Sequence, residues 1–262
     1  MQPIFDVQNI ADDRNLPINC AGIKGIRFPV TVTDEAVKQS HPSIAVFDML
    51  VDLPAHQKGT HMSRFVEILN EAPVTLSSCR MPHLLNTIAT RLEAQHAFLT
   101  ASFVFFMEKT APASGAKSLM DYDVSLSASL EDQILSQKMT LQIPITSLCP
   151  CSKKIAQYGA HNQRSHVTMQ LWYDAPISIV EIIHLVESEA SCELYALLKR
   201  PDEKIVTERA YENPKFVEDL VRDIARKLQN FPGLTQFTLA SENFESIHNH
   251  SAFAQIRWKR QP

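Results

Sequence analysis

The sequence predicts an α+β protein made of two similar halves. Three observations predict this class: segments rich in Val, Ile and Phe, segments with apolar residues spaced three and four apart, and the same ββααββ order of these segments in each half. We expect antiparallel sheets with two helices packed on one face, because amphipathic elements must bury their apolar side. The boundary falls near residues 132–137, so we predict one unit over residues 1–134 and a second over residues 135–262.

The first half opens with strand signals, continues with two helices and returns to strands. Its helical segments carry apolar residues at positions i, i+3, i+4 and i+7, which places them along one side of a helix. Its last strand alternates apolar residues with serines, which requires one buried face. The predicted strands are residues 23–34, 43–55, 97–109 and 123–131, and the predicted helices are residues 61–72 and 81–95.

The second half repeats this order of elements. A helix beginning near Ile179 follows the first two strands. A second helix over residues 213–231 is predicted to have Asn213 as its N-cap and Pro214 at its first helical position. Between these helices, residues 200–214 are predicted to form an acidic loop. The predicted strands are residues 138–146, 166–174, 234–244 and 252–260.

Composition excludes several classes of protein. The chain has 262 residues, 45% of them hydrophobic, a net charge of −4 and a pI near 6.2. It can therefore bury a full core, and its charge provides no general field for nucleic acid or an anionic membrane. The first twenty residues carry no targeting signal, no apolar run is long enough for a membrane span, and the five cysteines are too scattered for a disulfide scaffold. We expect a cytoplasmic protein with reduced thiols and with no nucleic-acid or membrane partner.

Two of the cysteines flank a proline in the segment SLCPCSKK, residues 147–154. Residues two apart on an extended segment point to the same side, so Cys149 and Cys151 can face one cavity, and Pro150 suits a strand end or a loop. The Cys-x-Cys spacing alone is equally compatible with two small buried apolar residues. The motif by itself therefore leaves both interpretations open.

Two later segments add imidazoles and a carboxylate. In GAHNQRSHVTM, His161 lies close in sequence to the cysteines and can exchange a proton near neutral pH, whereas His166 is interpreted as a solvated loop residue. In SENFESIHNHS, Glu245, His248 and His250 crowd together at the end of a strand. A carboxylate with imidazoles suits Zn²⁺, Mn²⁺ or Fe²⁺, and the alternative is a solvated hairpin tip.

The first half contains a cationic cluster in which Lys58, His61 and Arg64 meet the start of a predicted helix. Helix N-termini with nearby cations attract anions. The alternative is a capped helix with exposed cations, and this segment alone favours that alternative. A substrate that carries several phosphates would reverse the preference.

Six segments together resemble the type IB GTP cyclohydrolases of bacteria, in the order that this family has them. The resemblance covers essentially the whole chain, and the segments are KGTHMSRF, SLCPCSK, GAHNQRS, LLKRPDEK, AYENPKFVEDLVRD and NFESIHNHSAFA. It implies a bimodular tunnelling fold of two ββααββ units and a homotetramer, in agreement with the duplication described above. It also implies conversion of GTP and water to formate and 7,8-dihydroneopterin triphosphate, the first step of tetrahydrofolate biosynthesis.

The resemblance further implies roles for individual residues. Cys149 is expected to be essential and to contact a divalent metal ion, Zn, Mn or Fe, and His161 is expected to transfer a proton. Glu218 is expected to bind the guanine edge, with an exposed pair with Arg222 as the alternative. Cys151 is expected to be a second ligand, a redox partner of Cys149 or a bystander. The other expected metal ligands are Glu203, Glu245 and His248, and the candidate triphosphate ligands are Lys58, His61, Arg64 and Arg164.

Alternatives to this activity remain. An archaeal relative of the family forms a cyclic phosphate product instead, and product analysis separates the two. From a different class, the chain could be a structural or regulatory zinc-binding protein with a closed set of ligands. Pterin synthases and cysteine-dependent nitrile reductases share the fold, but they lack the pair of segments HNQRS and NFESIHNH.

Overall fold

The computed structural model describes residues 11–261, which form six helices and ten strands. These residues divide into two compact units, and the α+β class is confirmed. Unit 1 comprises the chain up to residue 33 with residues 38–103 and 125–138, and unit 2 comprises residues 34–37, 104–124 and 139–262. Each unit contains three separate stretches of the chain, so this division has no single boundary. The boundary predicted between residues 134 and 135 therefore stays a prediction. Residues 1–10, part of the segment predicted to lack a targeting signal, lie outside the described residues.

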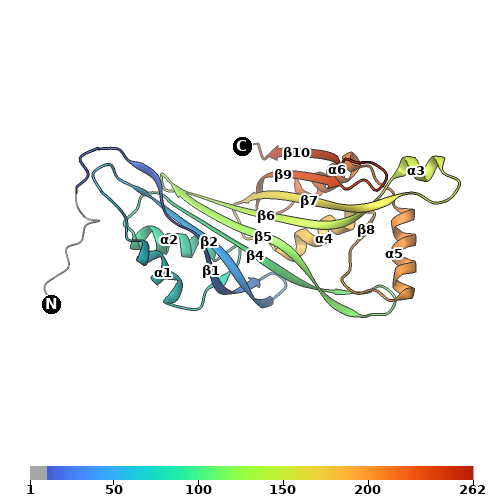
Figure 1. Ribbon diagram of the computed structural model, residues 1–262, viewed down its shortest axis with the longest axis horizontal. Helices are drawn as coiled ribbons and strands as arrows, with labels where there is room; N and C mark the ends of the chain where they lie inside the picture. Colours follow the sequence, from blue (N-terminus) through green and yellow to red (C-terminus); the bar gives the residue numbers. More distant parts are fainter. Residues whose placement is uncertain (1–10, 262) are drawn as a thin grey trace. The chain divides into compact units, whose positions relative to one another are not determined.

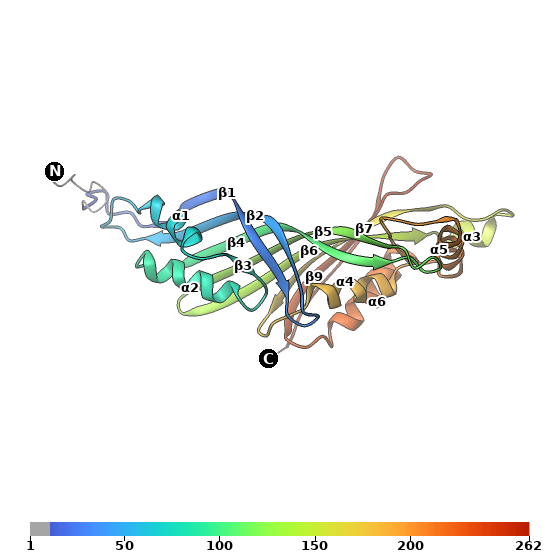
Figure 2. The same ribbon diagram turned by 90° about the horizontal axis from the view of Figure 1, so that it is seen from below.

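Unit 1 is a sheet with two helices on one face (Figures 1 and 2). Its strands follow the order β3-β1-β2-β4-β5-β6, and β4 to β6 also give residues to unit 2. The pair β2 and β4 is antiparallel, whereas β1 and β3 run parallel. The strands are β1 (Ile18–Asp34), β2 (Gln39–Leu53), β3 (Thr75–Leu76), β4 (Ala97–Thr110), β5 (Lys117–Glu131) and β6 (Ile134–Leu148).

Both predicted helices of unit 1 are present, but their predicted apolar side is buried only in part, because Met62 and Val66 are 43% and 38% exposed. The helices are α1 (Met62–Asn70) and α2 (Met81–Arg91), which contact each other. Phe65 and Leu69 of α1 and Leu85 of α2 are fully buried, because they lie on the sides of the helices that cover the sheet. The polar sides of both helices face solvent.

Unit 2 carries the larger set of helices. Its strands follow the order β10-β9-β7-β6-β5-β4, with β8 paired to β6. Helix α6 packs on β9 and β10 and against α4, so these two helices share one face of the sheet (Figure 2). The added strands are β7 (Asn162–Tyr173), β8 (Cys192–Glu193), β9 (Leu234–Asn243) and β10 (Ala252–Lys259), and the helices are α3 (Pro150–Ile155), α4 (Ile179–Glu189), α5 (Arg200–Glu212) and α6 (Val217–Leu228).

One segment of unit 2 differs from the prediction, because the expected acidic loop over residues 200–214 is helix α5. Asp202 fixes its first turn by accepting a hydrogen bond from the Lys199 backbone N–H at 2.9 Å. The helix was missed because it is largely solvated: Asp202 and Ala210 are its buried residues. A short apolar face of this kind leaves little periodicity in the sequence.

The start of the following helix also differs from the prediction. Helix α6 begins at Val217 with Phe216 as its N-cap, not at Pro214. Asn213 is instead the C-cap of α5, where its backbone N–H binds the Arg209 carbonyl. Residues 213–216 therefore form a linker between two helices. None of the helices in residues 11–261 is long and apolar enough to cross a membrane.

Candidate active site

The cysteine segment is fixed at the junction of β6 and β7 by a small set of hydrogen bonds. The Cys149 backbone N–H binds the His161 carbonyl at 3.1 Å. The Ser152 hydroxyl donates to the Cys149 carbonyl at 3.1 Å and accepts from the His161 backbone N–H at 3.2 Å. Cys149 is the N-cap of α3, and its Sγ accepts from the Ser152 backbone N–H at 3.5 Å. The backbones of Cys149 and His161 are thus held together in one local structure.

A cavity of about 200 Å³ lies beside this thiol. Its wall comes from segments that are distant in sequence, and strand pairing brings them together. In the sheet, Ser165 of β7 lies opposite Asn243 of β9, which lies opposite Ala252 of β10. The lining residues are Cys149, Pro150, Gln163, Lys215, Phe216, Val217, Glu218, Asn243, Glu245 and Ala252.

His161 is joined to Glu245 through Gln163. The Nδ1 atom of His161 lies 3.0 Å from Gln163 Oε1, and Gln163 Nε2 donates to Glu245 Oε1 at 3.5 Å. Because an amide oxygen can only accept, Nδ1 carries the proton in this arrangement and Nε2 is the acceptor. His161 Nδ1 also lies 3.8 Å from Glu245 Oε2, and both side chains are largely buried. These contacts fix the orientation of the imidazole beside Glu245.

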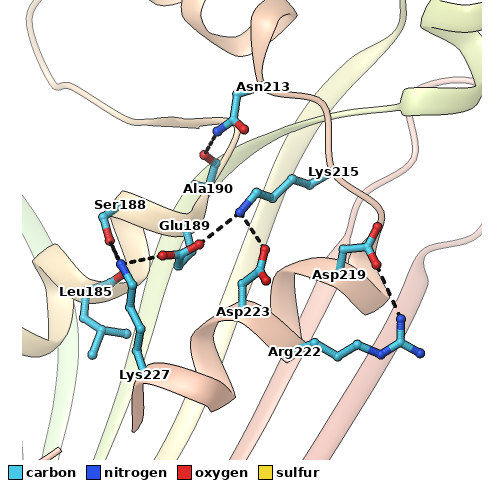
Figure 3. A network of polar contacts seen from close by, with 10 residues as sticks. All are labelled: Leu185, Ser188, Glu189, Ala190, Asn213, Lys215, Asp219, Arg222, Asp223 and Lys227. Atoms are coloured by element: carbon cyan, nitrogen blue, oxygen red, sulfur yellow. Dashed lines mark hydrogen bonds and ion pairs between the residues drawn. The ribbon is translucent and has the colours of Figure 1, made fainter. Parts of the chain in front are cut away.

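The linker before α6 also lines the cavity and is held by a polar network (Figure 3). Lys215 Nζ binds Glu189 at 3.0 Å and Asp223 at 2.8 Å. Burial acts to lower the pKa of Lys215, but the hydrogen bonds to Asp223 and Glu189 outweigh it and the pKa is raised. Burial likewise acts to raise the pKa of Glu189, but its hydrogen bonds from Lys227 and Lys215 lower it. Lys215 is therefore a fixed cation within this network.

The structure brings three of the sequence-predicted residues together around the cavity: Cys149, Glu218 and Glu245. His161 lies directly behind Glu245. His248 is exposed in the turn between β9 and β10, where its ring stacks on His250 with centroids 5.1 Å apart. His248 is therefore not among the residues that line this cavity.

Glu203 is exposed near the start of α5. Val206 lies one turn after Glu203 and Ala210 lies two turns after it, on the same side of the helix. Those two residues pack with Leu148 and Ala160, the neighbours of Cys149 and His161 in the chain. Glu203 thus shares the face of α5 that packs against the base of the cysteine segment, although it does not line the cavity.

The candidate triphosphate ligands lie elsewhere. Arg164 is on the opposite face of β7 from Gln163, and with His166 it lines a second cavity of about 340 Å³. Lys58, His61 and Arg64 belong to unit 1, where His61 is the N-cap of α1. Arg64 Nη1 donates to the Arg91 carbonyl at 3.3 Å. Their roles as phosphate ligands stay predictions.

The cavity offers donors that suit a divalent ion, although residues 11–261 contain no group of three or more His, Cys, Asp or Glu side chains arranged to hold one. A cysteine sulfur and a carboxylate line the cavity, with an imidazole behind them, and Zn²⁺, Mn²⁺ and Fe²⁺ accept such ligands. Cys149 and Glu245 therefore fit as ligands, and the full predicted set stays a prediction. Cys151 is exposed and does not line the cavity, unlike Cys149.

Two site residues were missed in the sequence. Gln163 follows His161 by two positions, and the alternation of β7 puts it on the buried side with Ser165. That alternation was a usable signal, because residues two apart on a strand share a face. Lys215 left no such signal, since its partners Glu189 and Asp223 lie on other elements.

Comparison with known proteins places the chain among close relatives. A family model described as type I GTP cyclohydrolase folE2 matches residues 4–254. GTP cyclohydrolase FolE2 of Neisseria gonorrhoeae is 53% identical over 258 residues, covering 98% of this chain and 100% of that protein. GTP cyclohydrolase FolE2 2 of Dechloromonas aromatica is 53% identical over 253 residues, covering 97% of this chain and 93% of that protein.

Solved structures show the same fold at low sequence identity. Uricase from Arthrobacter globiformis superposes with a TM-score of 0.54 at 7% identity, covering 93% of this chain and 94% of that one. Urate oxidase from Bacillus subtilis 168 gives a TM-score of 0.53 at 10% identity, covering 92% and 98%. These likenesses concern the fold alone, and they confirm the predicted tunnelling fold.

Proposed function

Since the chain belongs to the type I GTP cyclohydrolase FolE2 family, we propose that it is a metal-dependent enzyme that converts GTP and water to formate and 7,8-dihydroneopterin triphosphate. This reaction is the first step of tetrahydrofolate biosynthesis. The observation that carries the proposal is a single cavity lined by Cys149, Glu218 and Glu245, with His161 behind Glu245. We further propose that the protein is a cytoplasmic homotetramer.

Glu218 serves as the guanine anchor in this proposal. It lines the cavity in the first turn of α6, which puts it within the space proposed for the base. A carboxylate can accept hydrogen bonds from both N1–H and the 2-amino group of guanine. The cavity, at about 200 Å³, is smaller than the roughly 300–1,000 Å³ of sites that enclose a drug-sized ligand. It suits the purine ring, with the triphosphate extending toward cations outside it.

His161 serves as the proton carrier. Opening the imidazole ring of guanine requires addition of water at C8 and a proton on the departing ring nitrogen. With Nδ1 bound to Gln163, Nε2 of His161 can take a proton from water and deliver it to that nitrogen. Formate leaves after a second hydrolysis, and the ribose carbons then close onto the freed amine.

Cys149 and Glu245 would hold the divalent ion, with Glu203 and His248 as the remaining predicted ligands. When bound, such an ion supplies a Lewis acid that makes water a stronger acid near neutral pH. The side chain of Glu245 is 14% exposed, and Gln163 keeps its carboxylate oriented toward His161. Arg164, Lys58, His61 and Arg64 are the proposed cations for the triphosphate.

Reconstitution of metal-free protein tests this function. GTP is added with Zn²⁺, Mn²⁺ or Fe²⁺ in turn, formate is quantified, and the pterin is followed by fluorescence after oxidation. We expect one formate for each GTP and a linear triphosphate product with at least one metal. No turnover with all three ions would overturn the proposal, and a cyclic phosphate product would establish the archaeal-type activity instead.

A structural zinc-binding role is distinguished by the Cys149→Ala variant and by metal removal. The enzyme proposal predicts that this variant stays folded and releases no formate. A structural role predicts that metal removal unfolds the protein and that the wild type turns over no GTP. Circular dichroism and the formate assay on the same samples separate the two outcomes.

A further inference from the structure

We propose that Lys215 is a positioning residue that sets the place of Glu218 relative to Cys149, and through it the preference for guanine. This inference rests on the proposed function, because it assigns Glu218 to the base. Lys215 is three residues before Glu218, and both line the cavity. Its contacts connect the end of β6, next to Cys149, with helices α4 and α6.

The backbone of Lys215 is hydrogen-bonded to the cysteine segment. Its N–H donates to the Leu148 carbonyl at 3.1 Å, and Leu148 is the last residue of β6 before Cys149. One hydrogen bond therefore joins the linker in front of α6 to the strand that ends at the thiol. In this proposal, a displacement of the linker moves Glu218 relative to Cys149.

The side chain of Lys215 ties the same linker to the helix layer (Figure 3). Nζ lies 3.0 Å from Glu189 of α4 and 2.8 Å from Asp223 of α6. Lys227 of α6 also pairs with Glu189, so α4 and α6 are connected twice through one carboxylate. Lys215 thus bonds to three elements: β6, α4 and α6.

Burial separates the Lys215–Glu189 pair from ordinary surface pairs, whereas Asp223 and Lys227 of the same network are 46% and 48% exposed. The side chains of Lys215 and Glu189 are 17% and 15% exposed. On the neighbouring helix α6, Arg222 and Asp219 are 69% and 51% exposed and lie 3.4 Å apart. Partly buried pairs are screened less by solvent and hold a fixed geometry better than exposed pairs do.

The linker has a second anchor. Asn213 Nδ2 donates to the Ala190 carbonyl at the end of α4, at 2.7 Å. With Asn213 retained, loss of the Lys215 side chain frees only the segment next to Glu218. The expected consequence is a small shift of the Glu218 carboxylate with the fold intact, and misplacement of about 1 Å in a site can cost about 10²-fold in rate.

The test compares Lys215→Met with Arg222→Met, a cation-to-methionine change at an exposed pair on the helix that follows the linker. The readouts are kcat and KM for GTP and the Ki of ITP as a competitor, because ITP lacks the 2-amino group. We expect Lys215→Met to lower kcat/KM for GTP by about 10–100-fold while the Ki of ITP changes much less. Arg222→Met should keep wild-type values, and Lys215→Arg should restore part of the loss, because it keeps the charge.

The results that would disprove the positioning role of Lys215 differ from those that would disprove the proposed function. A purely structural role would lower the active fraction and leave KM, the Ki of ITP and their ratio unchanged, which would overturn the inference. Equal weakening of GTP and ITP would overturn it as well. Glu218→Gln is the reference: if it abolishes the preference for GTP and Lys215→Met does not, the positioning role alone fails. If Glu218→Gln keeps the preference, the proposed base contact fails and the inference fails with it.

Discussion

Replacing Gln163 with methionine should reduce the rate of the chemical step without unfolding the protein. Gln163 is 9% exposed, and methionine has nearly the same length and volume. The change removes the oxygen that lies 3.0 Å from His161 Nδ1 and the amide that lies 3.5 Å from Glu245. The imidazole then loses the partner that fixes which nitrogen carries the proton.

The magnitude follows from these distances. The 3.0 Å contact is a full hydrogen bond, whereas the 3.5 Å contact lies at the limit for one. A buried hydrogen bond contributes about 1 kcal/mol, so we expect kcat to fall about fivefold to tenfold. Removal of the imidazole itself in His161→Ala should cost about 10²–10⁴-fold. The double variant should therefore be no slower than His161→Ala.

Single-turnover formate release, with Gln170→Met as a matched exposed control on β7, measures these rates. The control should retain the wild-type rate. An unchanged rate in Gln163→Met would refute this role of Gln163. So would a double variant whose loss is the product of the two single losses, because residues that act through one another are not additive.

Three further predictions concern stability and the thiol. Lys109→Met should lower the free energy of unfolding by about 3–5 kcal/mol. The Lys109–Glu187 pair is 2.6 Å long and its side chains are 8% and 6% exposed, so the variant leaves a buried carboxylate without its cation. Urea unfolding measures this change, and a loss below about 1 kcal/mol would contradict the prediction. Because the pKa of Glu189 is lowered in the folded protein, its ion pairs contribute stability above the unfolded value near 4.5, and that contribution is lost as pH falls through the folded pKa. The urea midpoint should therefore fall more steeply below pH 5 in the wild type than in Glu189→Gln, and parallel curves would argue against the pairs. Cys149→Ser should retain the wild-type circular dichroism spectrum and lose formate release, whereas retained activity would remove the thiol from the mechanism.

The fold could be predicted where local periodicity reflects burial. In β7, Val167, Met169 and Leu171 alternate with more exposed neighbours, and the structure buries all three. Helix α5 was not predictable in this way, because Asp202 secures it through partners far along the chain. The backbone N–H groups of Ala113 and Ser114 donate to Asp202 at 2.7 and 2.8 Å, and no local pattern records such contacts.

The residues of the candidate site could likewise be predicted from the sequence only in part. Cys149 and Glu245 could be named as candidates because their residue types carry chemistry, and the resemblance supplied Glu218. Their convergence depends on the register of β7, β9 and β10, which a single sequence does not specify. Gln163 and Lys215 act through other residues, so only the three-dimensional contacts single them out.

A crystal structure of the Cys149→Ala variant with GTP tests the central claim most directly, because the substrate should stay intact in it. The account predicts that the guanine edge lies within hydrogen-bond distance of Glu218, with C8 toward position 149 and His161. A base bound in the second cavity beside Arg164 and His166, or one turned away from Glu218, would contradict the account.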